Sequence, residues 1–200
     1  MKTFGKARDD GAQIGREALI ALGGNQSSVA GGPADTVMKS LKILENMGVQ
    51  VVAVSPLYST HAYPPGTGPN FVNTTARIRF DGEADQILAI LHAVEGQLGR
   101  ERTNRWGPRT VDLDLIAMGD TVLPDAKTQA LWRKLAFDQQ SVRAPNELIL
   151  PHPRLQDRAF VLVPLADIAP DWRHPLIGKT VREMLNDLPE ADKKGVWPME

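Results

Sequence analysis

The sequence predicts an α+β fold in which helices cover a central sheet. Stretches with the two-residue period of strands alternate along the chain with stretches that have the 3.6-residue period of helices. The predicted strands also differ in burial: 18–22 is apolar throughout, as in a strand buried on both faces, whereas 71–80 alternates between apolar and polar residues. A sheet covered by helices accommodates both kinds of strand.

Size and composition indicate one ordinary domain. The chain has 200 residues, 42% hydrophobic and 24% charged, and we expect a domain over 17–188 between a disordered tail, 1–16, and a loosely held tail, 189–200. A net charge of −1 argues against a general nucleic-acid binder. The absence of cysteine excludes disulfides and thiol nucleophiles, and no stretch resembles a membrane span or signal peptide. We expect a cytoplasmic protein with no membrane or nucleic-acid partner.

The first predicted strand, Ala18–Leu22, runs into a Gly23-Gly24-Asn25 turn. Glycine permits positive φ and a close approach of the backbone to a ligand. For a Gly-Gly pair on its own, a plain turn is the better interpretation.

A helix is predicted between Pro33 and Gly48, because apolar residues recur there at helical spacing and glycine is a common helix stop. Core packing explains those apolar residues. A strand over 49–54 follows and continues irregularly through 55–60. The prolines and glycines of 61–68 then predict a loop.

The strand over 71–80 places an aromatic ring and an amide, Phe71 and Asn73, on one face. Its inward residues are predicted to be Val72, Ala76, Ile78 and Phe80, and its outward residues Asn73, Thr75, Arg77 and Arg79. A ring and an amide together could stack on, and hydrogen-bond to, a flat heterocycle. For Asn73 alone, an ordinary sheet edge is the better interpretation.

The helix predicted over 85–98 has an apolar stripe made of Ile87, Leu91, Val94 and Leu98. Glu95 lies at the rim of this stripe, about 60° from its centre, where glutamates are usually solvated. His92 and Glu95 are not interpreted as a metal-binding pair, because no second histidine-bearing helix accompanies them.

The segment 99–119 concentrates charge of both signs. Its four arginines are Arg100, Arg102, Arg105 and Arg109. A strand over 110–118 follows, with Asp112 and Asp114 on one face, where ionised carboxylates repel each other unless cations lie between them. Magnesium, held by one or two carboxylates together with phosphates, is the natural cation, and the arginines would bind phosphate oxygens. Taken singly, the aspartates are better interpreted as facing solvent, and so is the arginine-rich loop. Taken together, the aspartates and the arginines favour a nucleotide–metal site.

The last part of the chain begins with a long connection, 120–147, in which a short helix is predicted around 129–137. The sequence assigns this connection no chemistry. His152 stands between two prolines, where histidine is most often a loop residue. Thr180 and Glu183 form a capping box that opens the last helix.

The segment Arg105–Ile116, which reads RWGPRTVDLDLI, closely resembles the signature of the 6-hydroxymethyl-7,8-dihydropterin pyrophosphokinases, a family of folate-pathway enzymes. The resemblance covers about 18–175 and implies a ferredoxin-like three-layer sandwich with a mostly antiparallel sheet. It also implies transfer of the pyrophosphoryl group of ATP to 6-hydroxymethyl-7,8-dihydropterin, with release of AMP. A monomer is expected.

The resemblance implies four groups of site residues, and the acid pair and the arginine cluster are already suggested by their own chemistry. The catalytic residues are Arg100, Arg109 and Asp112. The metal ligands, which would hold two Mg²⁺ ions with ATP, are Asp112 and Asp114. The ATP-binding residues are Glu95, Arg102, Trp106, His152 and Arg158. The pterin-binding residues are Gly23, Asn25, Thr60, Phe71, Asn73 and Phe160.

Two other classes of function stay open. A nucleic-acid module would use the arginines for phosphates and Trp106 for stacking, although the paired aspartates would repel the backbone. A catalytically silent binding domain would bind pterin without releasing AMP and would tolerate loss of Asp112. The proton acceptor of the reaction is also open, with Asp112 as one candidate.

Overall fold

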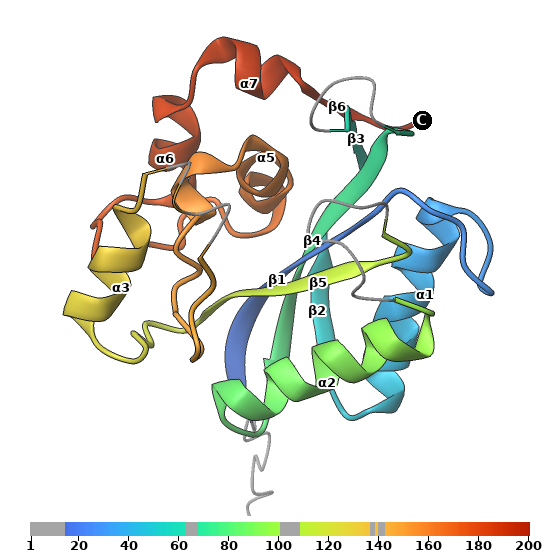
Figure 1. Ribbon diagram of the computed structural model, residues 1–200, viewed down its shortest axis with the longest axis horizontal. Helices are drawn as coiled ribbons and strands as arrows, with labels where there is room; N and C mark the ends of the chain where they lie inside the picture. Colours follow the sequence, from blue (N-terminus) through green and yellow to red (C-terminus); the bar gives the residue numbers. More distant parts are fainter. Residues whose placement is uncertain (1–14, 63–67, 101–108, 137–138, 140–142) are drawn as a thin grey trace, which may run out of the picture.

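A six-stranded antiparallel sheet forms the centre of the computed structural model, which describes residues 15–62, 68–100, 109–136, 139 and 143–200 (Figure 1). The strand order is β5-β1-β4-β3-β6, and β2 also pairs with β4. The strands are β1 (Arg16–Gly24), β2 (Gln50–Val54), β3 (Tyr58–Thr60), β4 (Phe71–Phe80), β5 (Asp112–Met118) and β6 (Val196–Pro198).

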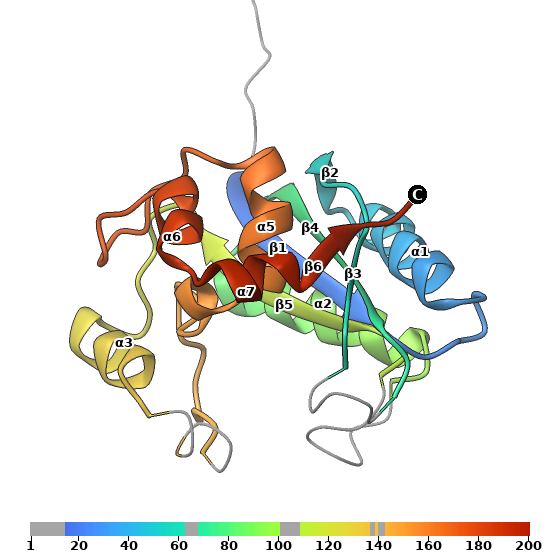
Figure 2. The same ribbon diagram turned by 90° about the horizontal axis from the view of Figure 1, so that it is seen from above.

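Helices cover both faces of the sheet, which gives three layers (Figures 1 and 2). One face carries α1 (Pro33–Asn46) and α2 (Ala84–Gln97), and the other carries α5 (Ala159–Ile168) and α6 (Val181–Asp187). The remaining helices are α3 (Ala126–Arg133), the 3₁₀ helix η1 (Leu155–Asp157) and α7 (Glu190–Lys194). The predicted α+β three-layer fold is confirmed. No helix in the described part of the chain is long and apolar enough to cross a membrane.

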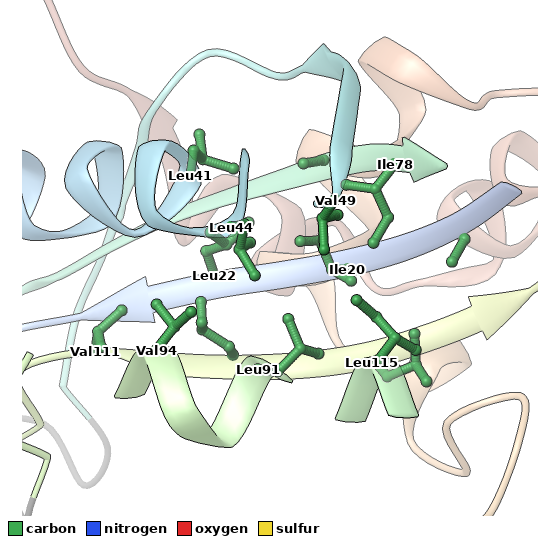
Figure 3. Close-up of a cluster of buried hydrophobic side chains, with 14 of the residues drawn as sticks. Ile20, Leu22, Leu41, Leu44, Val49, Ile78, Leu91, Val94, Val111 and Leu115 are labelled. Atoms are coloured by element: carbon green, nitrogen blue, oxygen red, sulfur yellow. The ribbon is translucent and has the colours of Figure 1, made fainter. Parts of the chain in front are cut away.

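Two hydrophobic clusters hold the layers together. The larger lies beneath α1 and α2 and includes Ile20, Leu44 and Leu91 (Figure 3). The smaller lies beneath α5 and α6 and includes Leu19 and Leu162. Because β1 contributes to both clusters, its apolar run has no solvent face, as the sequence predicted. Each fully buried aliphatic side chain contributes about 1.5–3 kcal/mol to the free energy of unfolding.

A bulge at Ile116 corrects the predicted alternation of β5. The register against β1 shifts there, so that Ile116 has no partner on β1. Strict alternation predicts Met118 on the face of Asp112 and Asp114. The extra residue moves Met118 to the opposite face, in the cluster beneath α1 and α2.

The outward face of β4 is not a solvent face. Asn73 and Thr75 were predicted to point outward, and they are 7% and 0% exposed. The reason is that α5 packs across this face of β4. Asn73 and Thr75 therefore lie between two layers, where polar atoms need partners.

Other element boundaries follow from local capping and from pairing. The Asp125 side chain accepts hydrogen bonds from two backbone N–H groups, so α3 begins at Ala126, earlier than predicted. The predicted capping box of Thr180 and Glu183 is present at the start of α6.

The last residues, 189–200, form α7 and β6 instead of the expected loose tail. Val196 is 9% exposed and β6 pairs with β3. This correction depends on a pairing between segments far apart in sequence. At the other end of the chain, β1 already begins at Arg16, inside the expected N-terminal tail.

Candidate active site

The predicted site residues meet where β1 ends and where β4 and β5 begin. The strand register places Gly23 opposite Asp112 of β5 on one side and opposite Asn73 of β4 on the other. Residues that are directly opposite in a sheet point to the same face. A carboxylate and an amide therefore stand on one face with a glycine between them. A Cβ at Gly23 would lie 2.9 Å from Asn73 Oδ1, so this position favours glycine.

The two aspartates are already paired with arginines. Arg100 Nη1 lies 2.5 Å from Asp112 Oδ1, and Arg109 contacts the other oxygen of the same carboxylate. Asp114 Oδ2 accepts a weaker hydrogen bond from Arg158 Nη1 at 3.4 Å. These guanidinium groups offset the repulsion between the two acids in this structure. The two Mg²⁺ ions expected at this acid pair stay a prediction.

Glu95 is buried, unlike most glutamates at the rim of an apolar stripe. Its side chain is 3% exposed, because the last turn of α2 packs against β5. Glu95 Oε1 accepts a hydrogen bond from Leu113 N at 2.8 Å and is also paired with Arg100. Glu95 therefore ties α2 to β5 and directs Arg100 toward Asp112. Its predicted contact with ATP stays a prediction.

Asn25 joins three segments around the end of β1. Asn25 Oδ1 accepts from Arg109 N at 3.0 Å, and Asn25 Nδ2 donates to Pro69 O at 3.1 Å. The Asn25 backbone N–H also donates to Arg109 O at 3.0 Å. Next to it, a Cβ at Gly24 would lie 2.4 Å from Thr110 O, so only glycine allows this close approach.

The expected pterin residues form a neutral cluster beside the aspartates. Asn73 Nδ2 donates to Thr60 Oγ1 at 3.0 Å, and Thr60 is opposite Phe71 in the register of β3 and β4. Phe160, on α5, keeps 39% of its surface exposed, and the Arg158 guanidinium lies 5.6 Å from its ring centroid. The predicted stacking of a ring between Phe71 and Phe160 stays a prediction.

His152 is held in one tautomer. Its Nδ1 accepts from Arg154 N at 3.1 Å, and its backbone N–H donates to Ile116 O at 2.8 Å. The neutral ring therefore carries its proton on Nε2. Desolvation, followed by the positive charges of Arg158 and Arg154, holds the pKa of His152 well below its ordinary value. The ring is a neutral donor at physiological pH.

Comparison with known proteins decides the family. A family model described as 7,8-dihydro-6-hydroxymethylpterin-pyrophosphokinase (HPPK) matches residues 19–170. The chain belongs to the HPPK family. This confirms the resemblance read from the signature around Asp112.

Two HPPK relatives cover most of the chain. A 2-amino-4-hydroxy-6-hydroxymethyldihydropteridine pyrophosphokinase of Pseudomonas aeruginosa is 35% identical over 175 residues, which are 87% of this chain and 93% of that protein. The Synechocystis protein of the same name is 34% identical over 182 residues, 91% of this chain and 80% of its own length.

Solved HPPK structures share the fold. A Plasmodium falciparum HPPK-DHPS structure superposes with a TM-score of 0.61 at 14% sequence identity. The match covers 88% of this chain but only 45% of that one. At this identity the likeness supports the ferredoxin-like fold alone.

One charged residue near the HPPK site was not singled out from the sequence. Within the described part of the chain, Arg154 Nε and Nη1 are buried and have no hydrogen-bond partner. The nearest ion pair joins Arg154 Nε to Asp157 Oδ2 at 3.8 Å. Burial lowers the pKa of Arg154. The feature of the sequence that could have identified Arg154 as a site residue is its place two residues after His152 in the Pro-His-Pro-Arg segment.

Two predicted ATP-binding residues, Arg102 and Trp106, lie outside the described residues. The remaining predicted residues fall into two neighbouring groups. The charged group consists of Glu95, Arg100, Arg109, Asp112, Asp114 and Arg158, and the neutral His152 accompanies it. The neutral group consists of Gly23, Asn25, Thr60, Phe71, Asn73 and Phe160.

Proposed function

We propose that this chain transfers the pyrophosphoryl group of ATP to the hydroxymethyl group of 6-hydroxymethyl-7,8-dihydropterin and releases AMP. The observation that carries the proposal is the row across the sheet from Asp112 through Gly23 to Asn73. One end of this row has the charges that a triphosphate requires, and the other end has an amide that can bind a heterocycle. Both ends of the row point to the same face of the sheet, which suits transfer between a nucleotide and a flat ring.

Asp112 and Asp114 fit magnesium as a donor set. Both supply hard oxygen ligands from one strand, and their side chains are 25% and 38% exposed, so ions can reach them. In the described part of the chain no three His, Asp or Glu side chains converge as a metal site. Magnesium suits such a pair, because water and phosphate oxygens commonly complete its shell. When bound, two Mg²⁺ ions would neutralise triphosphate charge and lower the pKa of the substrate hydroxyl.

Arg100 and Arg109 would exchange partners when ATP binds. Both now pair with Asp112. Each guanidinium released from Asp112 can offer its N–H donors to phosphate oxygens. Arg100 needs little reorganisation, because buried Glu95 holds it beside the acid pair. Donors placed in advance stabilise developing charge most effectively.

His152 and Arg158 would also bind phosphate oxygens. His152 offers a neutral Nε2–H, because its Nδ1 is already an acceptor. Arg158 adds a full positive charge beside Asp114. A neutral donor and a charged donor together orient the triphosphate for in-line attack.

The neutral group would hold the pterin. Asn73 and Thr60 supply an amide and a hydroxyl to a flat ring, and Phe71 and Phe160 supply aromatic faces. Gly23 keeps the floor between the two groups free of side-chain atoms. The hydroxymethyl group would then point from the pterin toward Asp112.

The test is AMP release from ATP and 6-hydroxymethyl-7,8-dihydropterin, with and without Mg²⁺. We expect pterin- and Mg²⁺-dependent AMP, and a loss of about 10³-fold or more in Asp112→Ala. The matched control is Asp120→Ala, because Asp120 is exposed and lies just beyond the other end of β5. No AMP from the folded wild-type protein contradicts the function, and near-normal turnover in Asp112→Ala contradicts the assigned metal site.

A further inference from the structure

The short strand β3 depends on the C-terminal strand for its second neighbour. β3 has three residues and lies between β4 and β6 (Figure 2). Thr60 is opposite Phe71 on one side and opposite Val196 on the other. A strand of this length at a sheet edge has few hydrogen bonds to prevent fraying. β6 makes β3 an interior strand.

The C-terminal segment holds β3 at both of its ends. Directly after β3, the ring of His61 lies 4.8 Å from the ring of Trp197, measured between centroids. Directly before β3, Leu57 O accepts a hydrogen bond from Met199 N at 2.9 Å. These two contacts fix the register of the strand between them. His61 is fixed further by a 3.1 Å contact between its Nδ1 and Asn70 Oδ1.

β3 carries one member of the neutral group. The Thr60 hydroxyl accepts from Asn73 Nδ2, so a slip of β3 would separate these two side chains. The aspartates, in contrast, belong to β5, and β5 and β6 stand at opposite ends of the strand order. A change in β6 should therefore act on the neutral group and spare the acid pair.

We propose that β6, with Trp197 as its main side-chain contact, is a positioning element for the pterin. It holds the Thr60 hydroxyl within hydrogen-bond distance of Asn73 before the substrate arrives, which reduces the ordering cost of binding. Trp197 acts through His61 and β3 and is therefore a positioning residue. The inference rests on the proposed function, because that function places the pterin beside Thr60.

The experiment compares Trp197→Ala with Trp197→Phe and with a deletion of residues 196–200. We expect Trp197→Ala and the deletion to raise the KM for 6-hydroxymethyl-7,8-dihydropterin about tenfold, with the KM for ATP nearly unchanged. Trp197→Phe should recover most of the loss, because an aromatic ring can still pack on His61. The controls are deletion of Glu200 alone and Trp132→Ala, which removes the same side chain from α3.

A direct titration separates this inference from the proposed function. The fluorescence of 6-hydroxymethyl-7,8-dihydropterin reports its Kd in the presence of a non-hydrolysable ATP analogue, and a thermal melt reports folding. Equal losses of pterin and ATP affinity, or no loss at all, would overturn the role of Trp197. If the protein lacking residues 196–200 does not fold, the comparison of Trp197→Ala with Trp197→Phe tests the inference. A wild-type protein that binds the pterin but releases no AMP would contradict the function, and the titration would still decide the inference.

Discussion

The two halves of the site use different interactions to prepare for a ligand. In the charged half, Asp112 and Asp114 are held by the guanidinium groups of Arg100, Arg109 and Arg158. In the neutral half, Asn73 and Thr60 are joined by one hydrogen bond between uncharged groups. Both halves are formed before a substrate arrives, but by forces of different strength and range.

This difference indicates which half of the site must rearrange when a substrate binds. Ion pairs at partly exposed positions can be exchanged for other ion pairs at small net cost, because each charge is kept satisfied. A buried neutral hydrogen bond cannot be exchanged so freely, since a buried group without a partner costs about 1–3 kcal/mol. We therefore expect the charged half to change partners and the neutral half to keep its geometry.

After Asp112→Ala, the largest effect in the charged half should come from Arg100→Ala. We expect kcat to fall about 10²–10³-fold, because a preplaced donor for transition-state charge is lost. The Kd for ATP should change much less. Single-turnover kinetics with direct ATP binding would measure both, with Arg182→Ala as an exposed control. Equal losses in kcat and ATP affinity would make Arg100 a ground-state clamp and break the comparison.

Effects of pH on the fold must be separated from effects on the site, and His174 allows this. It is fully buried and its Nδ1 accepts from Leu176 N and Ile177 N. Desolvation, with a smaller contribution from Arg133, lowers the pKa of His174 to about 4. The unfolded chain then binds a proton more readily than the folded one, so stability is complete above pH ~6.5 and is lost toward pH 4, by about 3 kcal/mol.

The measurement is urea unfolding between pH 7 and pH 4. His174→Asn should flatten this pH dependence, and His92→Asn, at an exposed position on α2, should leave it intact. An unchanged pH dependence in His174→Asn would contradict the assignment. Activity in the same pH range can then be corrected for unfolding before the site is interpreted.

Glu95→Ala should lower the free energy of unfolding by about 1–3 kcal/mol, because Leu113 N would lose its buried acceptor. Glu95→Gln should cost less, since an amide oxygen can still accept that bond. Both variants should lower kcat by releasing Arg100. Chemical denaturation together with the AMP assay would check this, and Glu45→Ala, exposed on α1, is the control. A Glu95→Ala protein as stable as the wild type would refute this account.

The smallest effect is expected in the neutral half. Asn73→Ala should raise the pterin KM about tenfold, since one hydrogen-bonding group of the pocket is lost. The KM for ATP should stay the same. Raising the ionic strength should sharpen the contrast, because added salt weakens charged contacts with ATP and leaves neutral contacts with the pterin nearly unchanged. If the pterin KM changes with salt concentration as steeply as the ATP KM does, the two halves of the site do not differ in the way proposed.

Local patterns predicted much of this molecule. The presence of β4 and the shared face of Asp112 and Asp114 follow from the two-residue period of a strand. The helix stop at Gly48 follows from its positive φ of 85°. These features depend on residues that are close in sequence, so periodicity and turn chemistry are enough to find them.

The features that local patterns missed depend on distant partners. Glu95 is at the rim of its own helix, and only the packing of α2 on β5 buries it. The C-terminal strand has three residues and acquires its role from β3. The bulge at Ile116 depends on the register with β1.

Asn25 connects the two halves of the site mechanically. Its single side chain holds the backbone of Arg109 at one end and that of Pro69 at the other. Any shift of Arg109 toward a nucleotide therefore strains a contact next to the start of β4. The two substrates should accordingly bind with a coupling free energy, and thermodynamic reciprocity requires that energy to be identical whichever substrate binds first.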